Sequence, residues 1–457
     1  MVSGILAIVF IGATIVQLLF WLLVFARLGN YPSTPAWLKT VRAVFACFTE
    51  ARQPPTPKGE YIDAQPEIKS FCRESNSFDY PKLYSPLGVG GWSTSAQFCV
   101  QCKIPASGLV PVLGITTTNK PLTPLDTLLP PISIVICGCN EADNLNKYLD
   151  RFLDQDYPFF EVVVVNDNSV DETENFLLAF QKKYSILHPV TITEQHPPGK
   201  KFALQVGIAA AKYDLLLLSD ADCYPSSPHW IRHMQSLIKN EVLIGLGYSP
   251  YEYRNGLLNR FIRFEAIYTA IQYFSFSIVG MPYMGVGRNL IYHKSLYQQQ
   301  QGFSTHLDLA SGDDDLFVNA VATGKNTAVQ LASESFVFTI PKMTWGGYYH
   351  QKTRHLTTGT RYKPMHQLVL GMLSASHFFH YVGGLAWGLY LGHWSIILIF
   401  YLARATVVAM VSRPIFSRLK ALSLWPWMLP LDLVYLFYYF VFAPVLIIGN
   451  PRTSWKH

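Results

Sequence analysis

Residues Leu215 to Pro225 read LLLLSDADCYP, and this stretch decides the predicted fold. Its apolar run has the length and character of a buried strand in a parallel sheet. The run ends in Asp220-Ala221-Asp222, which places two carboxylates two positions apart. Oxygen ligands of this kind hold Mg²⁺ or Mn²⁺ against a diphosphate, and open α/β sheets bind ligands beyond the carboxyl ends of their strands. A turn or a helix cap would explain the same aspartates, so this motif alone leaves both interpretations open.

The composition is that of a chain partly embedded in lipid. Of the 457 residues, 50% are hydrophobic and only 14% are charged, below the roughly 25% usual for soluble domains. The net charge of +6 comes without a long basic run, so no nucleic-acid partner is expected. Cys137, Cys139 and Cys223 lie in or beside predicted strands, which favours a reducing cytoplasmic setting. A lone C-x-x-C at Cys99 and Cys102 is only a weak indication of zinc.

Apolar blocks near both ends of the chain are long enough to span a membrane. Residues Ile5 to Phe25 carry no charge and lack a basic leader and a small-residue cleavage site, which indicates an uncleaved anchor. Arg27, Lys39 and Arg42 follow it, so the positive-inside rule places the next segment in the cytoplasm. Three further blocks lie at Leu368 to Leu391, Trp394 to Val411 and Trp425 to Ile448.

Ionisable residues lie within and between the C-terminal blocks. The loop between the second and third of these blocks carries Arg413, Arg418 and Lys420, which fits a return to the cytoplasm. His377 and His380 lie in the first block. Ionisable residues at membrane depth invite a functional interpretation, but a neutral histidine near a helix end is the commoner case.

From Pro131 onward the sequence alternates between strand-like and helix-like segments. This alternation predicts a parallel, doubly wound α/β sheet with right-handed crossovers. The predicted strands are Ile132 to Cys137, Glu161 to Val165, Val190 to Thr193 and Tyr213 to Ser219. The predicted helices between them are Asn144 to Asp154, Asp171 to Tyr184 and Gly199 to Ala211. Further on, Phe261 to Gly280 is expected either to lie at the bilayer surface as an amphipathic helix or to be a buried core helix.

Two positions beside the predicted strands fit nucleotide chemistry. Asp167 ends the second strand in VVVVNDNSVDET, where its carboxylate could accept a hydrogen bond from a nucleobase; an Asx-turn or a helix cap explains it equally well. Lys200 and Lys201 open the third helix. A cation at a helix N-terminus opposes the helix dipole, which is easier to understand if a phosphate binds there. A solvated lysine pair is the plainer alternative.

Three aspartates, Asp313 to Asp315, stand in a row ahead of an apolar helical stretch. Adjacent carboxylates repel one another, although a helix start softens the repulsion. The functional interpretation is a general base that deprotonates an acceptor hydroxyl as it attacks a sugar carbon. Downstream, Gln351 and Arg354 lie in a basic cluster, where Arg354 could bind a diphosphate through two hydrogen bonds. The alternative is a juxtamembrane cluster that holds lipid head groups.

Taken in order, these motifs resemble the membrane-bound family 2 nucleotide-sugar glycosyltransferases, a group that includes cellulose, chitin and hyaluronan synthases and many bacterial envelope transferases. The resemblance covers residues 131–363. It implies a GT-A-like α/β fold with a doubly wound, mostly parallel sheet, together with one N-terminal and about three C-terminal transmembrane helices. The chain would then divide into an anchor (1–28), an irregular linker or insertion (29–130), a cytoplasmic transferase domain (131–363) and a C-terminal transmembrane region (364–457).

The resemblance also implies a role for each matched residue. Asp222 corresponds to the metal ligand of the D-x-D motif, and Asp314 falls where the catalytic base lies, with Asp313 beside it. The implied donor-binding residues are Asp167, which would bind the nucleobase, Lys200, Asp220, Gln351 and Arg354.

The sequence departs from the family pattern at two motifs. His355 stands where processive synthases carry the tryptophan of Q-x-x-R-W, which lines their acceptor platform. This change leaves open whether the chain extends a polymer or transfers a single sugar. Cys139 stands where many relatives carry an arginine before Asn140-Glu141, which removes one nucleotide contact.

The sequence therefore predicts an inverting, metal-dependent hexosyltransferase at the cytoplasmic face of the cell membrane, anchored as a multi-pass protein. The expected cofactor is Mg²⁺ or Mn²⁺, the donor is a nucleotide-diphospho sugar, and the acceptor is a saccharide or a lipid. Expected partners are the bilayer and, as further options, a second copy or an export protein. Two alternatives stay open: a single-sugar glycolipid synthase, and a membrane transport or structural protein with a degenerate transferase domain.

Overall fold

The computed structural model describes residues 2–31, 129–194, 199–306, 309 and 311–448. The described residues belong to one structural unit of the chain. The C-x-x-C pair of Cys99 and Cys102, and all but the ends of the predicted linker 29–130, lie outside the described residues.

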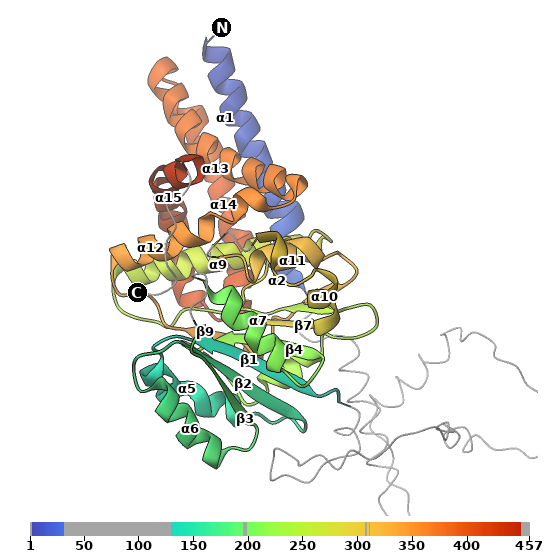
Figure 1. Cartoon of the computed structure of the whole chain (residues 1–457). Helices are drawn as coiled ribbons and strands as arrows, with labels where there is room; N and C mark the ends of the chain where they lie inside the picture. Colours follow the sequence, from blue (N-terminus) through green and yellow to red (C-terminus); the bar gives the residue numbers. More distant parts are fainter. Residues whose placement is uncertain (1, 32–128, 195–198, 307–308, 310, 449–457) are drawn as a thin grey trace, which may run out of the picture. The chain divides into compact units, whose positions relative to one another are not determined.

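A seven-stranded sheet in the order β3-β2-β1-β4-β7-β6-β8 forms the centre of the part of the described chain that lies outside the long apolar helices (Figure 1). Apolar β-branched and leucine-rich runs form its buried strands, as expected for a sheet covered on both faces. The strands are β1 (Ile132–Gly138), β2 (Phe160–Asp167), β3 (Leu187–Ile192), β4 (Leu215–Asp220), β6 (Ile244–Leu246), β7 (Leu290–His293) and β8 (Thr327–Val329).

The order in which strands are added to the sheet reverses at β1. Strands β2 and β3 lie on one side of β1, and β4 pairs with β1 on the other side, with all four parallel. In this register Cys137 is opposite Asp220. Ligands of open α/β sheets bind in the crevice beyond the strand ends at such a switch point. The topology therefore places the carboxylates after β4 at the expected binding edge.

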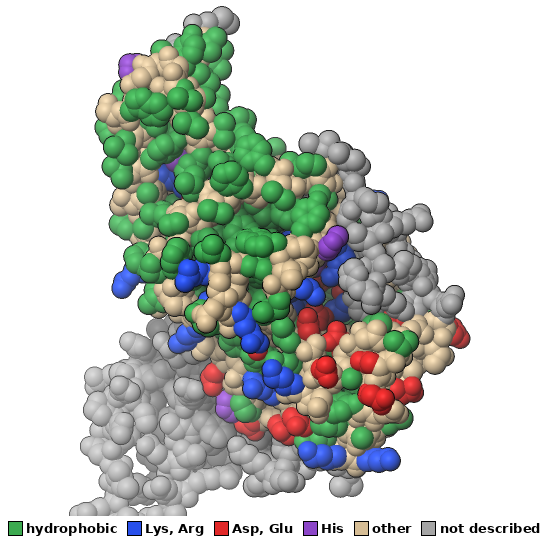
Figure 2. Space-filling view, turned by 90° about the vertical axis from the view of Figure 1, so that its left-hand side faces the viewer, with side chains coloured by type: hydrophobic (Ala, Val, Ile, Leu, Met, Phe, Trp, Pro, Cys, Tyr) green, Lys and Arg blue, Asp and Glu red, His purple; other side chains and the backbone are tan. Residues whose placement is uncertain are grey.

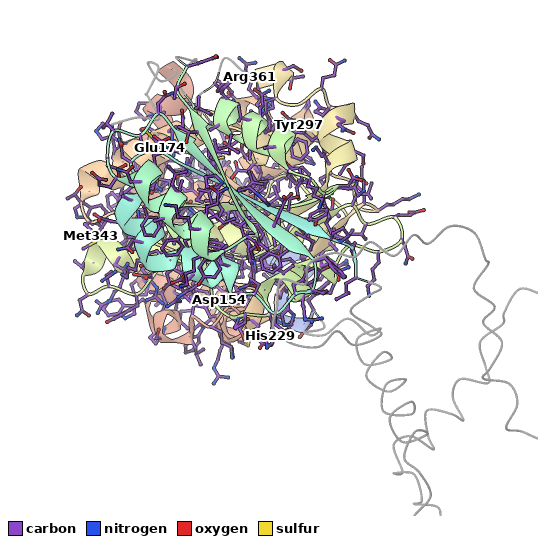
Figure 3. The ribbon with its side chains drawn as sticks, turned by 60° about the horizontal axis from the view of Figure 1, so that its bottom comes forward. Asp154, Glu174, His229, Tyr297, Met343 and Arg361 are labelled. Carbon is purple, nitrogen blue, oxygen red and sulfur yellow. The ribbon has the colours of Figure 1, made fainter. Side chains whose placement is uncertain are left out.

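Helices cover both faces of the sheet, so the fold is doubly wound as predicted. On one face α5 (Ala142–Leu153), α6 (Thr173–Lys183) and α8 (Trp230–Gln235) form one hydrophobic core with alternate residues of β1, β2 and β4. On the other face the second core contains α7 (Lys200–Ala210), α9 (Leu257–Ile278) and α11 (Asp315–Val321). Figure 3 brings the first of these faces forward and labels Glu174 of α6 and Asp154 at the end of α5.

The second half of the sheet is mixed. Strand β7 is antiparallel to both β4 and β6, and β8 is parallel to β6. A separate antiparallel pair joins β5 (Cys223–Pro225), which directly follows Asp222, to β9 (Val337–Thr339). This pairing ties the segment after the D-x-D motif to the chain just before α12 (Trp345–Leu356).

The segment Phe261 to Gly280, expected either at the bilayer surface or in the core, belongs largely to the core helix α9. Most of its side chains are buried, including Phe264, Glu265 and Phe274. It contacts α15 (Met428–Ile448) on one side and the end of the N-terminal helix on the other. Helix α9 is therefore a central element between the sheet and the apolar helices.

Four helical segments of the described chain are long and apolar enough to cross a membrane: residues 4–30, 364–391, 394–418 and 422–445. They contain α1 (Val2–Leu19), η1 (Phe20–Phe25), α2 (Ala26–Asn30), α13 (Pro364–Leu391), α14 (Trp394–Arg418), η7 (Leu422–Trp427) and α15. Large apolar side chains are exposed along them, and in Figure 2 the hydrophobic surface lies over these helices while charged side chains gather below. These features confirm the predicted fold class.

A buried polar cluster joins these apolar helices. Arg404 of α14 contacts both carboxylate oxygens of Asp432 of α15, at 2.6 and 3.2 Å. Arg404 also donates to Gln17 of α1, and His377 of α13 contacts Asp432 at 3.2 Å. His380 contacts Thr14 at 2.8 Å. Both histidines thus lie well inside α13 and contact other helices, so the expectation of histidines near a helix end was wrong.

The turn between α14 and α15 packs against the sheet-bearing part of the chain. The guanidinium of Arg260 in α9 stacks on Trp427 of η7, 4.4 Å from the ring centre. Arg413 stacks on Trp425 in the same turn. Arg413 and Arg418, which were expected in a loop, lie in the last turns of α14, because the helix continues past Val411 to Arg418. The basic end of α14 is therefore next to the sheet-bearing part of the chain.

Candidate active site

A cavity of about 880 Å³ opens at the carboxyl ends of β1 and β4 and extends to α13 and α15. Residues from both halves of the sheet, from α9, from α12 and from the apolar helices line it. All but one of the sequence-predicted site residues are among its lining residues: Lys200, Asp220, Asp222, Asp313, Asp314, Gln351 and Arg354.

The two carboxylates after β4 form the acidic end of this cavity. Ligand atoms of Asp220, Asp222 and Cys223 lie within 4.8 Å of one another. Burial raises the pKa of Asp222, and the charge of Asp220 raises it further. The Cys223 thiol donates to Asp222 Oδ1 at 3.3 Å. Two oxygen donors that repel each other in a buried setting fit a hard divalent cation, which would neutralise both.

Lys200 connects the D-x-D motif to the acidic turn. It is the first residue of α7, and Gly199 before it has φ of 138°. The Lys200 ammonium forms an ion pair with Asp220 and lies 3.6 Å from Asp313 Oδ2. Burial alone would lower the pKa of Lys200, but these two carboxylates hold it well above its usual value. The charge that opposes the helix dipole is therefore balanced by two acids.

Lys201 has a different function from its neighbour. Its buried ammonium donates to the backbone carbonyls of His306, at 2.5 Å, and Leu309, at 2.8 Å. It thus anchors the segment before the acidic turn. His306 in turn contacts the carbonyl of Gly312 at 2.8 Å through Nε2. The lysine pair that looked like one feature in the sequence serves two separate contacts.

The acidic turn begins at Gly312, whose φ of +104° favours glycine. A Cβ at Gly312 would also meet Leu316 at 2.6 Å. Asp313, the next residue, is 9% exposed, and the described residues donate no hydrogen bond to its carboxylate. Asp313 thus faces Lys200 with its oxygens available to a ligand.

Asp314 caps the start of α11. Its two carboxylate oxygens accept the backbone N–H groups of Gly287 and Asp315, both at 2.7 Å. The approach of Gly287 is close, since a Cβ there would lie 3.1 Å from that of Asp314. Burial, with the neighbouring charges of Asp313 and Asp315, raises the pKa of Asp314 to about 7.

Asp315 is bound by side chains of the segment that precedes α13. The hydroxyls of Thr358 and Tyr362 donate to its Oδ2, the latter at 2.8 Å. Burial raises its pKa, and these hydroxyls oppose the rise. Asp315 therefore joins α11 to the segment before α13.

Helix α12 carries the Q-x-x-R motif to the other side of the cavity. Gln351 Oε1 is buried and accepts no hydrogen bond from the described residues. Arg354 is close enough for its charge to lower the pKa of Asp220. Burial, with Arg354 and Lys352 nearby, lowers the pKa of His355 well below its usual value, so this imidazole is neutral. The motif thus offers a ligand the guanidinium of Arg354, the free acceptor atom Oε1 of Gln351 and the neutral imidazole of His355.

Asp167 is the predicted site residue that does not line this cavity. It is fully buried at the end of β2, and its charge contributes to the raised pKa of Cys137, which does line the cavity. Asp167 therefore shares the sheet edge with the site, one strand beyond β1.

Sequence reasoning missed several charged residues of the cavity. Glu141, whose pKa burial raises to about 7, lies near Asp222. Arg288 donates to Ser249 at 3.1 Å and stacks on Tyr251. Lys352 and Glu265 form an ion pair at 2.7 Å. No pattern in the sequence pointed to the Arg288 side chain.

The charge balance of the cavity favours a cation. Seven carboxylates line it against five lysines and arginines. A divalent ion would offset this excess of carboxylates, and the cations would then be free to bind an anionic ligand. The arrangement can thus hold a metal and a diphosphate together beside an available carboxylate.

Comparison with known proteins identifies the sheet-bearing segment. Residues 133–297 match the family model described as Glycosyl transferase family 2. The chain is 27% identical over 243 residues to the probable glycosyltransferase YdaM of Bacillus subtilis, an alignment that covers 50% of this chain and 54% of that protein. It is 30% identical over 134 residues to glycosyltransferase AglE of Haloferax volcanii, which covers 29% and 43%. The chain thus spans about half the length of these curated relatives.

Among solved structures, a mannosyltransferase of Pyrobaculum calidifontis, PcManGT, in complex with GDP-Man and Mn²⁺ is similar at 18% identity with a TM-score of 0.45. That likeness covers 70% of this chain and 91% of the other.

Proposed function

Since residues 133–297 match the family 2 glycosyl transferase model, we propose that this chain transfers a hexose from a nucleotide-diphospho sugar to an acceptor hydroxyl, with inversion at the anomeric carbon. One observation carries the proposal. Two carboxylates after β4, an acidic turn and the cations of α7 and α12 converge on one cavity at the sheet's switch point. This is the set of charges that departure of a diphosphate and attack by a hydroxyl require.

Asp222 and Asp220 are proposed to hold Mg²⁺ or Mn²⁺. Their crowded, buried carboxylates supply hard oxygen ligands at one edge of the cavity. When bound, such an ion supplies stabilisation for negative charge on the leaving diphosphate. Lys200 and Arg354 would bind the diphosphate oxygens from opposite sides, and the vacant acceptor Gln351 Oε1 would orient a ligand hydroxyl. Asp167, at the end of β2, would bind the nucleobase.

The two candidates for the general base differ in availability. Both oxygens of Asp314 already accept backbone N–H groups, whereas the Asp313 carboxylate accepts none from the described residues. Asp313 also lies beside Lys200, on the donor side. We therefore assign proton removal to Asp313 and the positioning of the turn to Asp314. In this assignment Asp313 takes the hydroxyl proton while the acceptor oxygen attacks the face opposite the diphosphate.

The transferase domain is proposed to lie in the cytoplasm as part of a multi-pass membrane protein. Four candidate spans and the basic turn beside the domain support this topology. The division into an anchor (1–28), a linker (29–130), a transferase domain (131–363) and a transmembrane region (364–457) remains part of the proposal.

The test is transfer by the purified full chain in lipid nanodiscs. A panel of nucleotide sugars is supplied with Mn²⁺, nucleotide release is measured, and the anomeric configuration of the product is determined by NMR. The proposal expects release with at least one donor, loss of release with a chelator, and inversion. A wild-type chain that releases nucleotide from no donor in the panel would favour a transport or structural role instead.

A further inference from the structure

A second cavity, of about 680 Å³, lies between α13 and α15 and adjoins the catalytic cavity. Two residues, Ser374 and Tyr439, line both cavities. They are the polar residues at this junction. The remaining lining residues are apolar: Ala375, Phe378, Phe379, Phe440, Ala443 and Pro444. We refer to this second cavity as the α13–α15 groove.

The groove suits an apolar chain rather than a saccharide. A hydroxyl-rich ligand would find few polar partners there beyond the Ser374–Tyr439 pair, and unpaired buried hydroxyls are costly. Both walls belong to segments long and apolar enough to cross a membrane. Phe379 and Phe440 are 45% and 57% exposed, so the groove is open to the surroundings of these helices.

The neighbouring part of the catalytic cavity has a different chemistry. Tyr268, Tyr435 and Tyr438 line it together with Tyr439, and the rings of Tyr435 and Tyr438 stack at 4.7 Å. Tyrosine combines an apolar ring with a polar hydroxyl and therefore suits a hydroxylated head group. The charges in this part, Glu265 and Lys352, neutralise each other.

We infer that the acceptor is a membrane lipid with an uncharged, hydroxyl-bearing head group. The head group lies in the tyrosine-lined part of the catalytic cavity, and its apolar chain passes Ser374 and Tyr439 into the α13–α15 groove. The inference rests on the proposed function and names its acceptor class. It also explains why His355 can stand in place of the tryptophan that lines the acceptor platform of processive synthases. The apolar chain of the lipid, rather than sugars stacked on an aromatic ring, would hold the acceptor in place. The two cavities are continuous at Ser374 and Tyr439, and a polar section is followed by an apolar section, as the head group and the chain of a lipid follow each other.

A photo-crosslinking experiment tests the groove without requiring turnover. The probe is octyl β-glucoside with a diazirine at the end of its chain, added to the full chain in nanodiscs. The expected labels fall on the groove walls, residues 374–379 and 439–444. Ala443→Trp and, from the facing helix, Ala375→Trp should remove most of this labelling, since an indole fills the groove. The matched control is Ala403→Trp, an exposed alanine of α14 that lines neither cavity.

Two results of this experiment would overturn the inference. One is equal labelling of the groove walls in all four proteins, which indicates ordinary lipid around the helices. The other is labelling of the groove walls that occurs in the monomer but is absent from dimers joined by a chemical cross-linker. That result indicates that a second copy of the protein covers the groove. Variants that do not match the wild type in size-exclusion profile are replaced by Ala443→Leu, a smaller obstruction.

A kinetic series separates this inference from the proposed function. Glucosides with chains from hexyl to decyl are supplied below their micelle concentration, with whichever donor the chain uses. Acceptor kcat/KM should rise roughly fourfold per added methylene in the wild type and in Ala403→Trp, and much less in Ala443→Trp. The same slope in Ala443→Trp would refute the lipid groove while transfer itself stands. Absence of nucleotide release with every donor would refute the proposed function, and the labelling result would still decide the groove.

Discussion

The change from Asp313 to asparagine separates the two candidate bases. Asparagine keeps the size of the side chain and removes its ability to take a proton. A positioned general base contributes about 10²–10⁴-fold to a rate. The expected loss in kcat is of this size, equivalent to roughly 3–5 kcal/mol in the activation barrier. Nucleotide affinity should change little, because Asp220 still pairs with Lys200.

Asp314→Asn is the matched control, one residue along the same turn. An amide nitrogen cannot accept a hydrogen bond, so the N–H of Gly287 or of Asp315 loses its partner. A buried donor left in this way costs about 1–3 kcal/mol of stability. This variant should therefore melt earlier than Asp313→Asn but retain much more of the wild-type kcat when folded.

The assay is nucleotide release at saturating donor and Mn²⁺ by nanodisc-embedded protein, with nucleotide affinity from calorimetry and the melting temperature as the check on folding. The argument from carboxylate availability would be refuted if Asp313→Asn kept nearly wild-type kcat while folded Asp314→Asn lost activity. The base would then be Asp314, the residue that the sequence motif indicated first.

Three further outcomes are expected. The pKa of Asp314, raised to about 7 by burial and its acidic neighbours, predicts that kcat/KM falls modestly as the pH drops below about 7, since protonation removes the same acceptor as Asp314→Asn does. This inflection should vanish in Asp314→Asn and persist in Glu141→Gln, which removes the other carboxyl of the cavity whose pKa is about 7. Asp222→Ala should abolish the Mn²⁺ dependence of nucleotide affinity in calorimetry, and an unchanged dependence would place the metal elsewhere. Arg404→Ala should destabilise the chain in detergent by about 3–5 kcal/mol, since it leaves Asp432 buried without its cation; a melting temperature equal to that of the wild type would contradict this.

The first half of the fold could be predicted because its signals are local. Buried parallel strands read as continuous apolar runs, and β1, β2 and β4 were predicted to within two residues at each end. Strand β3 was located less well, since it begins at Leu187 rather than Val190. It pairs with β2 alone and contains Pro189, so its burial pattern is weak.

The second half could not be predicted, because its strands are short and paired over long distances. Strands β6, β8 and β9 have three residues each and show no readable period. Their partners lie up to about a hundred residues away in sequence, and only the folded chain brings them together. The mixed direction of this half was therefore outside what the pattern could indicate.

The candidate site divides in the same way. Residues in short motifs, such as Asp222 and Arg354, were predicted to share one site, and the structure places them in one cavity. The contacts that distinguish Asp313 from Asp314 depend on Lys200 and Gly287, which come from other parts of the chain. The buried Arg404–Asp432 pair had a signal, because two ionisable residues in apolar blocks are unusual, and that signal was overlooked.

The central claim is that one donor molecule binds where β4 ends. The most direct measurement is an electron cryo-microscopy structure of the full chain with Mn²⁺ and a non-transferable nucleotide-sugar analogue. We expect the metal on Asp222, the diphosphate between Lys200 and Arg354, and the base near Asp167. A donor bound away from Asp222, or a diphosphate that contacts neither cation, would contradict the account.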